Sequence, residues 1–279
     1  MPAVRVFVAG ASGAIGRPLV KLLLQGGHEV WGTTRREEAA QALAAEGATP
    51  VVVDVYDANA LRDAVVQAAP DAVIHQLTDL AAMDYAANGR LRTVGTPNLV
   101  AAARAAGVER IVAQSIAWLY VAGAEPADER EPLDPSASPY PGVHALETSV
   151  RELREAVVLR YGMLYGPGTW YAPDGPIAAQ ARRGELVATP AWASFVHVDD
   201  AAGAAAAALD WTAGTFNVVD DEPAPGTAWV PAYCEALGAP NPRLDADAPA
   251  TGRPIANRAA RELGWRPSIA SWRSGFARQ

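Results

Sequence analysis

Three glycines near the start of the chain, Gly10, Gly13 and Gly16, have a spacing that suits phosphate binding. A short apolar run precedes them, and an amphipathic segment follows, with these apolar residues on one face: Ile15, Leu19, Leu22 and Leu23. A strand that turns directly into a helix leaves unpaired backbone N–H groups at a partly positive helix end. The pattern therefore predicts a pyrophosphate-binding turn, in which Gly10 forms the turn, Gly13 faces the phosphate and Gly16 packs against the sheet. We expect the intervening residues to contact the same ligand: Ser12, Ala14 and Ile15. An ordinary glycine turn is the alternative.

The end of the second apolar run, HEVWGTT, predicts which dinucleotide binds. Thr34 ends this predicted strand, and Arg35 and Arg36 follow it. A carboxylate at this place accepts hydrogen bonds from a free ribose 2′-hydroxyl, whereas arginine attracts a 2′-phosphate. We therefore expect NADP as the cofactor. The two glutamates that come next keep NAD as the alternative, and a solvated pair of charges is the plainest explanation of the arginines.

Apolar runs alternate with helical patterns through the first 160 residues. Strands are predicted over 28–34, 49–55, 71–77, 109–115 and 155–162, and helices over 37–48, 59–69 and 90–108. This order predicts an α/β fold with a doubly wound parallel sheet of the Rossmann type, which binds ligands at the carboxyl ends of its strands. Residues at those ends are expected cofactor contacts: Asp54, Val55, Leu77 and Thr78. His75, within the fourth strand, is interpreted as a core residue.

The alternation weakens after residue 160, which predicts two domains. The first covers 1–160, and 195–219 is expected to return to it. The segments 161–194 and 220–279 are expected to form a smaller C-terminal lobe for substrate. In the returning segment, Asp199 or Asp200 is expected to cap an alanine-rich helix.

Aromatic residues mark the expected substrate pocket. We predict that Trp118, Trp170 and Tyr171 line a pocket for a flat or apolar small molecule. Their alternative place is the core of the smaller lobe.

Composition excludes several classes of protein. Half of the 279 residues are hydrophobic and the formal net charge is −8, which disfavours disorder and a nucleic-acid surface. The single cysteine, Cys234, cannot form an internal disulfide, in agreement with a reducing compartment. We therefore expect a cytoplasmic protein without a membrane segment, acting on a small molecule as a homodimer. No metal-ligand spacing stands out in the sequence.

Eight short segments carry a resemblance to a known family. They are, in order, GASGAIG, VVVDV, VIHQL, GTPNLVAAARAAGV, LRYGMLYGPG, FVHVDDAA, GTFNVVDDEPAP and RELGWRP. With them the chain resembles the extended and atypical short-chain dehydrogenase/reductase family, which includes NAD(P)-dependent epimerases and dehydratases, over almost its whole length. The resemblance implies a Rossmann fold, a bound dinucleotide, and further cofactor contacts from Tyr161 and Met163.

The resemblance also implies an active site of a serine or threonine, a tyrosine, and a lysine four residues after the tyrosine. SPYPGVHALE is similar to that segment and places Tyr140 on the tyrosine and His144 on the lysine. Ser115 is the expected serine, and Ile116 takes that place in the alternative alignment. The only lysine of the chain, Lys21, belongs to the first predicted helix and cannot replace the missing one.

The missing lysine has a physical cost. An unassisted tyrosine forms phenolate at pH 7 at a cost of about 4 kcal/mol, or about three pKa units, and a neighbouring cation lowers that cost. Histidine is a cation over only part of the working pH range, so we expect His144 to assist incompletely. Pro141 favours Tyr140 at the start of a helix. A cap tyrosine and a surface histidine are the alternative to catalysis.

Two classes of function follow from the sequence. The first is an NADP-dependent oxidoreductase or epimerase/dehydratase-type enzyme for a small carbonyl or alcohol substrate, with a proton relay of Ser115, Tyr140 and His144. The second is a redox-neutral enzyme or nucleotide-sensing regulator that binds the cofactor without hydride transfer. We favour the first, because no partner-facing patch or tail is evident. Arg92 and Met163 stand where relatives often have asparagine, and Met163 disfavours a nucleotide sugar as substrate.

Overall fold

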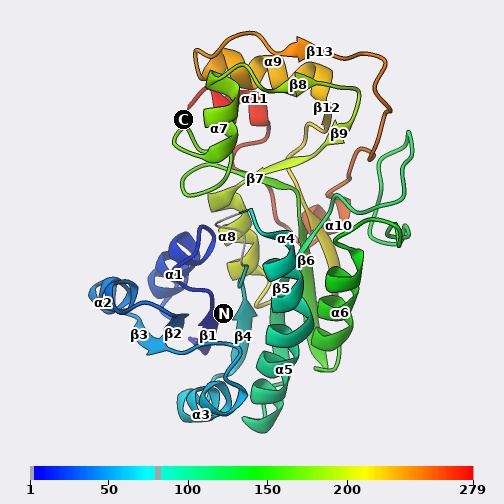
Figure 1. Ribbon diagram of the computed structural model, residues 1–279. Coiled ribbons are helices and arrows are strands. Elements are labelled where there is room, and N and C mark those ends of the chain that lie inside the picture. Colours follow the sequence, from blue (N-terminus) through cyan, green and yellow to red (C-terminus); the bar gives the residue numbers. More distant parts are fainter. Residues whose placement is uncertain (1–2, 79–82, 279) are drawn as a thin grey trace. The chain divides into compact units, whose positions relative to one another are not determined.

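The computed structural model describes residues 3–78 and 83–278. The chain forms two compact units, and each is built from three stretches of sequence (Figure 1). Unit 1 consists of Met1–Ser115, Pro135–Leu159 and Ala202–Thr215. Unit 2 consists of Ile116–Asp134, Arg160–Ala201 and Phe216–Gln279.

A seven-stranded parallel sheet organises the fold. In spatial order its strands are β11 (Gly214–Val218), β6 (Glu155–Tyr161), β5 (Arg110–Ile116), β4 (Ala72–His75), β1 (Arg5–Ala9), β2 (Glu29–Thr34) and β3 (Thr49–Val52). In register, Val8 of β1 lies opposite Gly32 of β2 and Ile74 of β4. The strand order reverses direction between β1 and β4, which is where doubly wound sheets bind their ligands. The predicted fold class is therefore confirmed.

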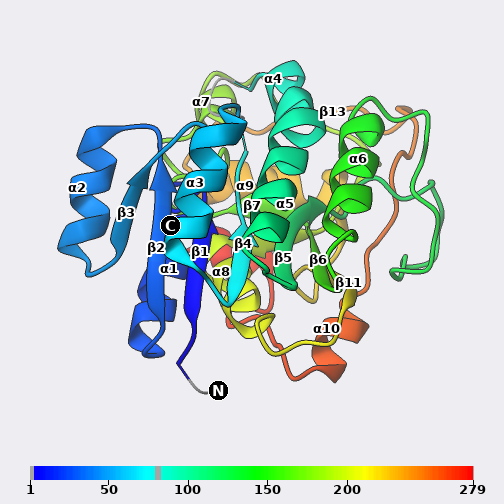
Figure 2. The same cartoon turned by 90° about the horizontal axis from the view of Figure 1, so that it is seen from below.

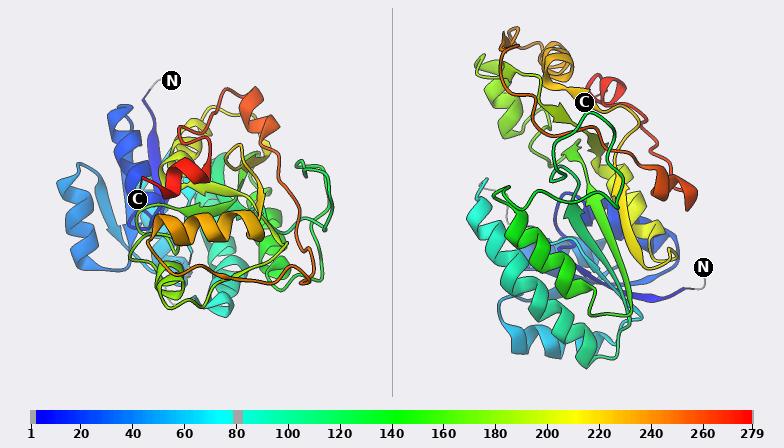
Figure 3. Two further views of the ribbon diagram at one scale, coloured as in Figure 1. Left: turned by 90° about the horizontal axis from the view of Figure 1, so that it is seen from above. Right: turned by 90° about the vertical axis from the view of Figure 1, so that its right-hand side faces the viewer.

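Helices cover both faces of this sheet. They are α1 (Gly16–Gln25), α2 (Glu37–Ala45), α3 (Ala58–Ala68), α4 (Tyr85–Arg90), α5 (Thr96–Ala105), α6 (Tyr140–Val150) and α8 (Val198–Ala207). The helices α3, α5 and α6 lie side by side on one face, and α1 lies on the other (Figures 2 and 3). The core on the α3–α5–α6 side is continuous and includes Phe7, Leu61, Leu99, Ile111, Leu146 and Val158.

Two helical predictions need correction. Leu22 is 39% exposed, because Gly16, Leu19, Val20 and Leu23 form the buried stripe of α1 and Leu22 lies at its margin. The predicted helix over 90–108 is a π-helical turn, Leu91–Gly95, followed by α5. A π turn widens the backbone locally and is common at functional sites.

Asp199 and Asp200 lie inside the first turn of α8, so the predicted N-terminal cap is wrong. The Asp200 carboxylate instead accepts hydrogen bonds from the backbone N–H and hydroxyl of Ser268 and from the N–H of Ile269, at 2.8, 2.6 and 3.1 Å. Asp200 therefore fixes a distant turn of unit 2.

Unit 2 is made of short elements around an aromatic core. They are β7 (Met163–Tyr165), α7 (Pro176–Arg182), β8 (Val187–Ala188), β9 (Trp192–Ala193), β10 (Phe195–His197), β12 (Ala224–Pro225), α9 (Gly226–Ala236), β13 (Arg243–Leu244), α10 (Arg258–Glu262) and α11 (Trp272–Phe276). The core contains Tyr165, Tyr171, Phe195, Tyr233, Trp272 and Phe276. None of the helices in the described ranges is long and apolar enough to cross a lipid bilayer.

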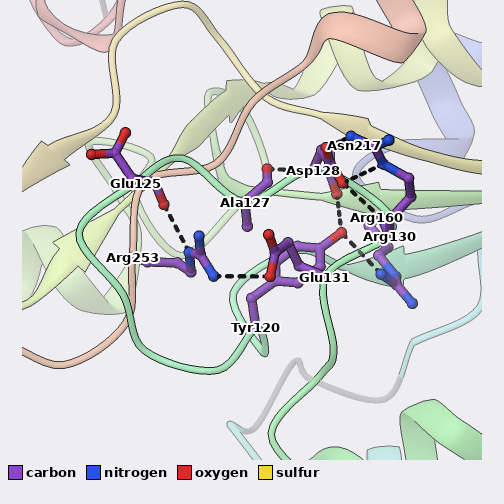
Figure 4. A network of polar contacts seen from close by, with 9 residues as sticks. All are labelled: Tyr120, Glu125, Ala127, Asp128, Arg130, Glu131, Arg160, Asn217 and Arg253. Atoms are coloured by element: carbon purple, nitrogen blue, oxygen red, sulfur yellow. Dashed lines mark hydrogen bonds and ion pairs between the residues drawn. The ribbon is translucent and has the colours of Figure 1, made fainter.

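A polar network holds the segment 116–134 within unit 2 (Figure 4). The buried Arg160 guanidinium donates to the Tyr120 hydroxyl at 2.9 Å, and that hydroxyl donates to Asn217 Oδ1 at 2.8 Å. The Asn217 backbone N–H donates to the Glu129 carboxylate at 2.7 Å, and burial raises the pKa of Glu129. Arg253 donates to the Glu125 carbonyl at 2.8 Å. Charged side chains thus order a segment that its composition alone would leave as a surface loop.

Candidate functional site

The glycine turn in unit 1 depends on its missing side chains. Gly10 has a φ of +91°, and a Cβ there would lie 2.7 Å from the carbonyl oxygen of Gln76. A Cβ at Gly16 would lie 2.1 Å from the carbonyl oxygen of Gly10. At Gly13, by contrast, the nearest protein atom would be the Gly10 oxygen at 3.3 Å. Gly10 and Gly16 therefore permit the close backbone packing, and Gly13 leaves room for a ligand.

Strand β2 holds this turn in place. The Gly10 N–H donates to Thr33 Oγ1 at 3.0 Å, and the Ser12 hydroxyl donates to Thr34 Oγ1 at 3.2 Å. A Cβ at Gly32 would lie 2.8 Å from the Cβ of Ala11, so β2 needs a glycine where the turn crosses it. Thr33 is not among the predicted contacts, although its place at the end of a predicted strand, beside Thr34, is a signal.

A pocket of about 140 Å³ lies at the carboxyl ends of β1, β2, β3 and β4. It brings together nine residues predicted to bind cofactor: Gly10, Ser12, Gly13, Thr34, Arg35, Asp54, Val55, Leu77 and Thr78. Gln76 and Tyr56 also line the pocket and were not predicted. The predicted cofactor contacts outside this lining are Ala14, Ile15, Gly16, Arg36, Tyr161 and Met163. Parallel strands therefore gather residues that are far apart in sequence at one edge.

The pocket residues fit a dinucleotide. Helix α1 begins at Gly16 with no side-chain cap and no acidic residue in its first turn, as far as the described chain shows. Its N-terminal N–H groups and dipole are therefore suited to a pyrophosphate. Arg35 is exposed and lines the pocket, whereas Arg36 precedes α2, makes no capping hydrogen bond with its side chain, and donates its backbone N–H to Thr34 Oγ1 at 3.2 Å. Only Arg35 of this pair borders the pocket.

Ser115 lies at the end of β5 and is 3% exposed. Its hydroxyl donates to Glu147 Oε1 of α6 at 2.8 Å. Glu147 is equally buried and also forms an ion pair with Arg151, at 3.0 Å. The serine proton is thus bound to a carboxylate that the sequence analysis did not single out.

Tyr140 and His144 share one face of α6. Tyr140 is the first residue of this helix, as Pro141 suggested, and its ring stacks on His144 with centroids 5.5 Å apart and planes 11° apart. Tyr140 is half-buried and His144 is exposed. The spacing of four residues brings the two rings together although Tyr140 starts the helix, so the start of the helix and the shared face do not exclude one another. A proton relay between them stays a prediction.

His75 has the core position that we preferred for it. It is fully buried, its Nδ1 accepts the Leu77 N–H at 3.2 Å, and its Nε2 therefore donates to Thr96 Oγ1 at 2.8 Å. Burial, and secondarily the charge of Arg92, lower the pKa of His75 to about 4. His75 is therefore a neutral structural residue at neutral pH.

The remaining candidates belong to unit 2. Tyr161 is buried and donates its hydroxyl to the Ala201 carbonyl at 3.3 Å. Tyr171 packs in the aromatic core with its ring centroid 5.5 Å from that of Phe195, and Trp170 and Met163 pack against the same core. Trp118 is half-buried. Contacts of these residues with cofactor or substrate stay predictions.

Comparisons with known proteins show the family and the fold of this chain. Residues 6–218 match the model of the NAD dependent epimerase/dehydratase family. A 3-diazoavenalumate denitrifying reductase from a Streptomyces species is 44% identical over 308 aligned positions, which cover 99% of this chain and all of that protein. A 4-hydroxy-2-methyl-3-oxo-4-farnesyl-3,4-dihydroquinoline-1-oxide ketoreductase from Stigmatella aurantiaca is 33% identical over 53% of this chain and 44% of its own length.

Solved structures share the fold over nearly the whole chain. UDP-glucose 4-epimerase of Thermus thermophilus, in complex with NAD, superposes with a TM-score of 0.79 at 25% identity, covering 98% of this chain and 96% of that one. WbmH of Bordetella bronchiseptica, in complex with NAD⁺, superposes with a TM-score of 0.81 at 22% identity, covering 99% and 96%.

Proposed function

This chain belongs to the NAD-dependent epimerase/dehydratase family and is an NAD(P)-dependent oxidoreductase, and on this basis we propose that the enzyme reduces a small aromatic diazo compound and releases dinitrogen. The observation that carries this proposal is the similarity, over the full length of both proteins, to a 3-diazoavenalumate denitrifying reductase. The departures of this chain from the family's acid–base residues support the same reaction.

A diazo acceptor needs no proton from the protein. When bound, the reduced nicotinamide would supply a hydride. An aryl diazonium ion that gains a hydride becomes an arene and dinitrogen, Ar–N₂⁺ + H⁻ → Ar–H + N₂, so atoms and charge balance without an acid. A carbonyl acceptor differs, because its oxygen must gain a proton from a group such as tyrosine.

The residues around the predicted relay agree with an acceptor of this kind. The Ser115 hydroxyl is buried and donates to Glu147. Ile116, in the alternative alignment, has no proton to give. His144 replaces the lysine that would assist Tyr140, and the two rings stack on one another. In this proposal Tyr140 and His144 orient the substrate, whereas a carbonyl substrate would require the relay of Ser115, Tyr140 and His144.

NADP is the proposed cofactor. Thr34 and Arg35 border the pocket where β2 ends, and no carboxylate of β2 competes with a 2′-phosphate there in the described chain. The neighbouring Asp54 lines the pocket from the segment after β3, and its Oδ1 accepts the Tyr56 N–H at 2.9 Å. A cytoplasmic location and a homodimer are also proposed, and light scattering tests the dimer.

The experiment that tests the function uses 3-diazoavenalumate labelled with ¹⁵N in the diazo group. We expect the protein with NADPH to release labelled dinitrogen and the arene, each in a 1:1 ratio to the NADPH consumed, as measured by mass spectrometry and nicotinamide absorbance. A reaction without protein corrects for direct reduction. No acceleration over that reaction would refute the proposal. If the protein reduces aromatic ketones and not the diazo compound, the hypothesis of a carbonyl substrate with a proton relay of Ser115, Tyr140 and His144 would be supported.

A further inference from the structure

Arg92 is a buried cation in the π-helical turn Leu91–Gly95 of unit 1. It is 7% exposed, and its Cδ lies 3.4 Å from the position that a Cβ would take on Gly142 of α6. Gly142 stands between Tyr140 and His144 in the same helix. The stem of Arg92 therefore packs against the helix that carries the predicted active-site residues.

Within the described part of the chain, the guanidinium of Arg92 has no protein partner. No hydrogen bond or ion pair joins it to any residue in the described ranges 3–78 and 83–278. The charge of Glu147 acts on it, but that carboxylate already accepts the Ser115 hydroxyl and pairs with Arg151. The nitrogens of Arg92 are not fully enclosed by protein and keep some contact with solvent.

An unpaired buried charge is costly to maintain. Burial lowers the pKa of Arg92 to about 10, while the Glu147 carboxylate acts in the opposite direction. The side chain thus stays a cation at neutral pH although desolvation disfavours it. Glutamine or methionine would fill similar space without that cost. A charge that is retained in this way, next to a candidate site, indicates a ligand of opposite charge.

We propose that Arg92 binds the carboxylate of the substrate, so that the enzyme selects aryl diazo acids over neutral aryl diazo compounds. This inference rests on the proposed function. The planar guanidinium donates two parallel hydrogen bonds to a carboxylate, which fixes the ligand's orientation as well as its charge. Anchoring one end of the substrate at Arg92 holds its ring beside α6.

A structural role is the competing explanation. Arg92 would then only offset the charge of Glu147, and its loss would weaken the fold without changing the choice of substrate. The two roles differ in one respect, because only a ligand contact distinguishes a carboxylate from its neutral ester.

The test compares an acid with its methyl ester in the parent protein and in Arg92→Gln and Arg92→Lys. Calorimetry with NADP⁺ present measures binding of 4-hydroxycinnamate and of methyl 4-hydroxycinnamate, two probes that lack a diazo group. Steady-state kinetics measures KM for the 3-diazo acid and for its methyl ester. Arg104→Gln is the matched control, since Arg104 lies on α5, is exposed and pairs with Glu152 at 2.9 Å.

We expect Arg92→Gln to weaken binding of the acid by about ten- to a hundredfold and to leave binding of the ester unchanged. Arg92→Lys keeps the charge but loses the second hydrogen bond, so its affinity for the acid lies between those of the other two proteins. Arg104→Gln matches the parent. The thermal midpoint of ligand-free Arg92→Gln stays equal to that of the parent or rises.

Equal affinity of the parent for acid and ester, or equal losses for both in Arg92→Gln, would overturn the inference. A fall in thermal midpoint with unchanged acid-to-ester discrimination would assign Arg92 a structural role and also overturn it. The two proposals fail separately. Arg92-dependent binding of the acid without turnover of the diazo acid refutes the function alone, and equal turnover of diazo acid and diazo ester refutes the Arg92 contact alone.

Discussion

Alanine substitutions at Gly13 and Gly16 should separate fold stability from cofactor binding. A Cβ at Gly16 would lie 2.1 Å from the Gly10 oxygen and 2.7 Å from the Ala11 carbonyl carbon, and both are backbone atoms that cannot turn aside. Overpacking of this kind costs about 1–3 kcal/mol. Since the backbone must shift by close to an ångström to reach an ordinary contact, we expect Gly16→Ala to lose about 3 kcal/mol of unfolding free energy.

The same substitution at Gly13 meets only the Gly10 oxygen, at 3.3 Å, and needs a small adjustment. We expect Gly13→Ala to lie within about 1 kcal/mol of the parent in stability. Its NADPH affinity should fall at least about tenfold, because the new methyl group occupies the approach to the pyrophosphate.

Urea unfolding followed by circular dichroism gives the stabilities, and calorimetry gives the affinities. Gly203→Ala is the control, because Gly203 lies in α8 with no atom within 4 Å of its would-be Cβ, and alanine favours helix by up to about 1 kcal/mol. If Gly16→Ala is as stable as Gly203→Ala, the packing argument is refuted. If Gly13→Ala binds NADPH as the parent does, the cofactor does not pass over Gly13.

Three further predictions concern the cofactor, the core and the reaction. Thr34→Asp combined with Arg35→Ala should weaken NADP binding by about ten- to a hundredfold and spare NAD; equal affinities of the parent for both dinucleotides in calorimetry would contradict this. Burial lowers the pKa of His75 to about 4, below its value of about 6.5 in the unfolded chain. Neutral His75 therefore contributes fully to the free energy of unfolding above pH 6.5, and this contribution is lost as the pH falls towards 4. The loss of unfolding free energy, measured by urea titrations across that pH range, approaches about 3 kcal/mol. His75→Gln should flatten the dependence of unfolding free energy on pH, and an unchanged dependence would disprove the role of His75. Tyr140→Phe should keep diazo turnover within about tenfold of the parent, and His144→Lys should leave the pH profile of diazo turnover unchanged. A loss of turnover of about a hundredfold or more in Tyr140→Phe would support the proton relay instead.

The fold of unit 1 was predictable because its signals are local. The run 71–77 alternates with helical patterns on both sides, and the observed β4 lies inside it. The glycine turn was predictable for the same reason, because a backbone position that cannot hold a side chain appears in the sequence as a glycine. Leu22 was misplaced because an apolar residue at the margin of a helical stripe looks the same in sequence as one at its centre.

The polar interior of the candidate site was not predictable from local pattern. The hydrogen bond from Ser115 to Glu147 joins residues 32 positions apart, and a glutamate on a helix is ordinarily assigned to the surface. Arg92 is unusual for its place in the sequence, but its burial, and its lack of a partner among the described residues, depend on how η1, the π turn, packs against α6. Such contacts are decided by tertiary packing, which neither periodicity nor composition reports.

The polar network of unit 2 also constrains how the protein is made. Arg253 follows its partner Glu125 by 128 positions, and Asn217 donates to the Ala256 carbonyl at 3.1 Å. A ribosome delivers the amino-terminal side of the chain first, so the segment 116–134 is synthesised long before the residues that hold it. Until residues 253–256 emerge from the ribosome, the segment 116–134 has incomplete hydrogen bonding and is open to chaperones and proteases. The segment therefore reaches its final hydrogen bonding only after these distant residues have been synthesised.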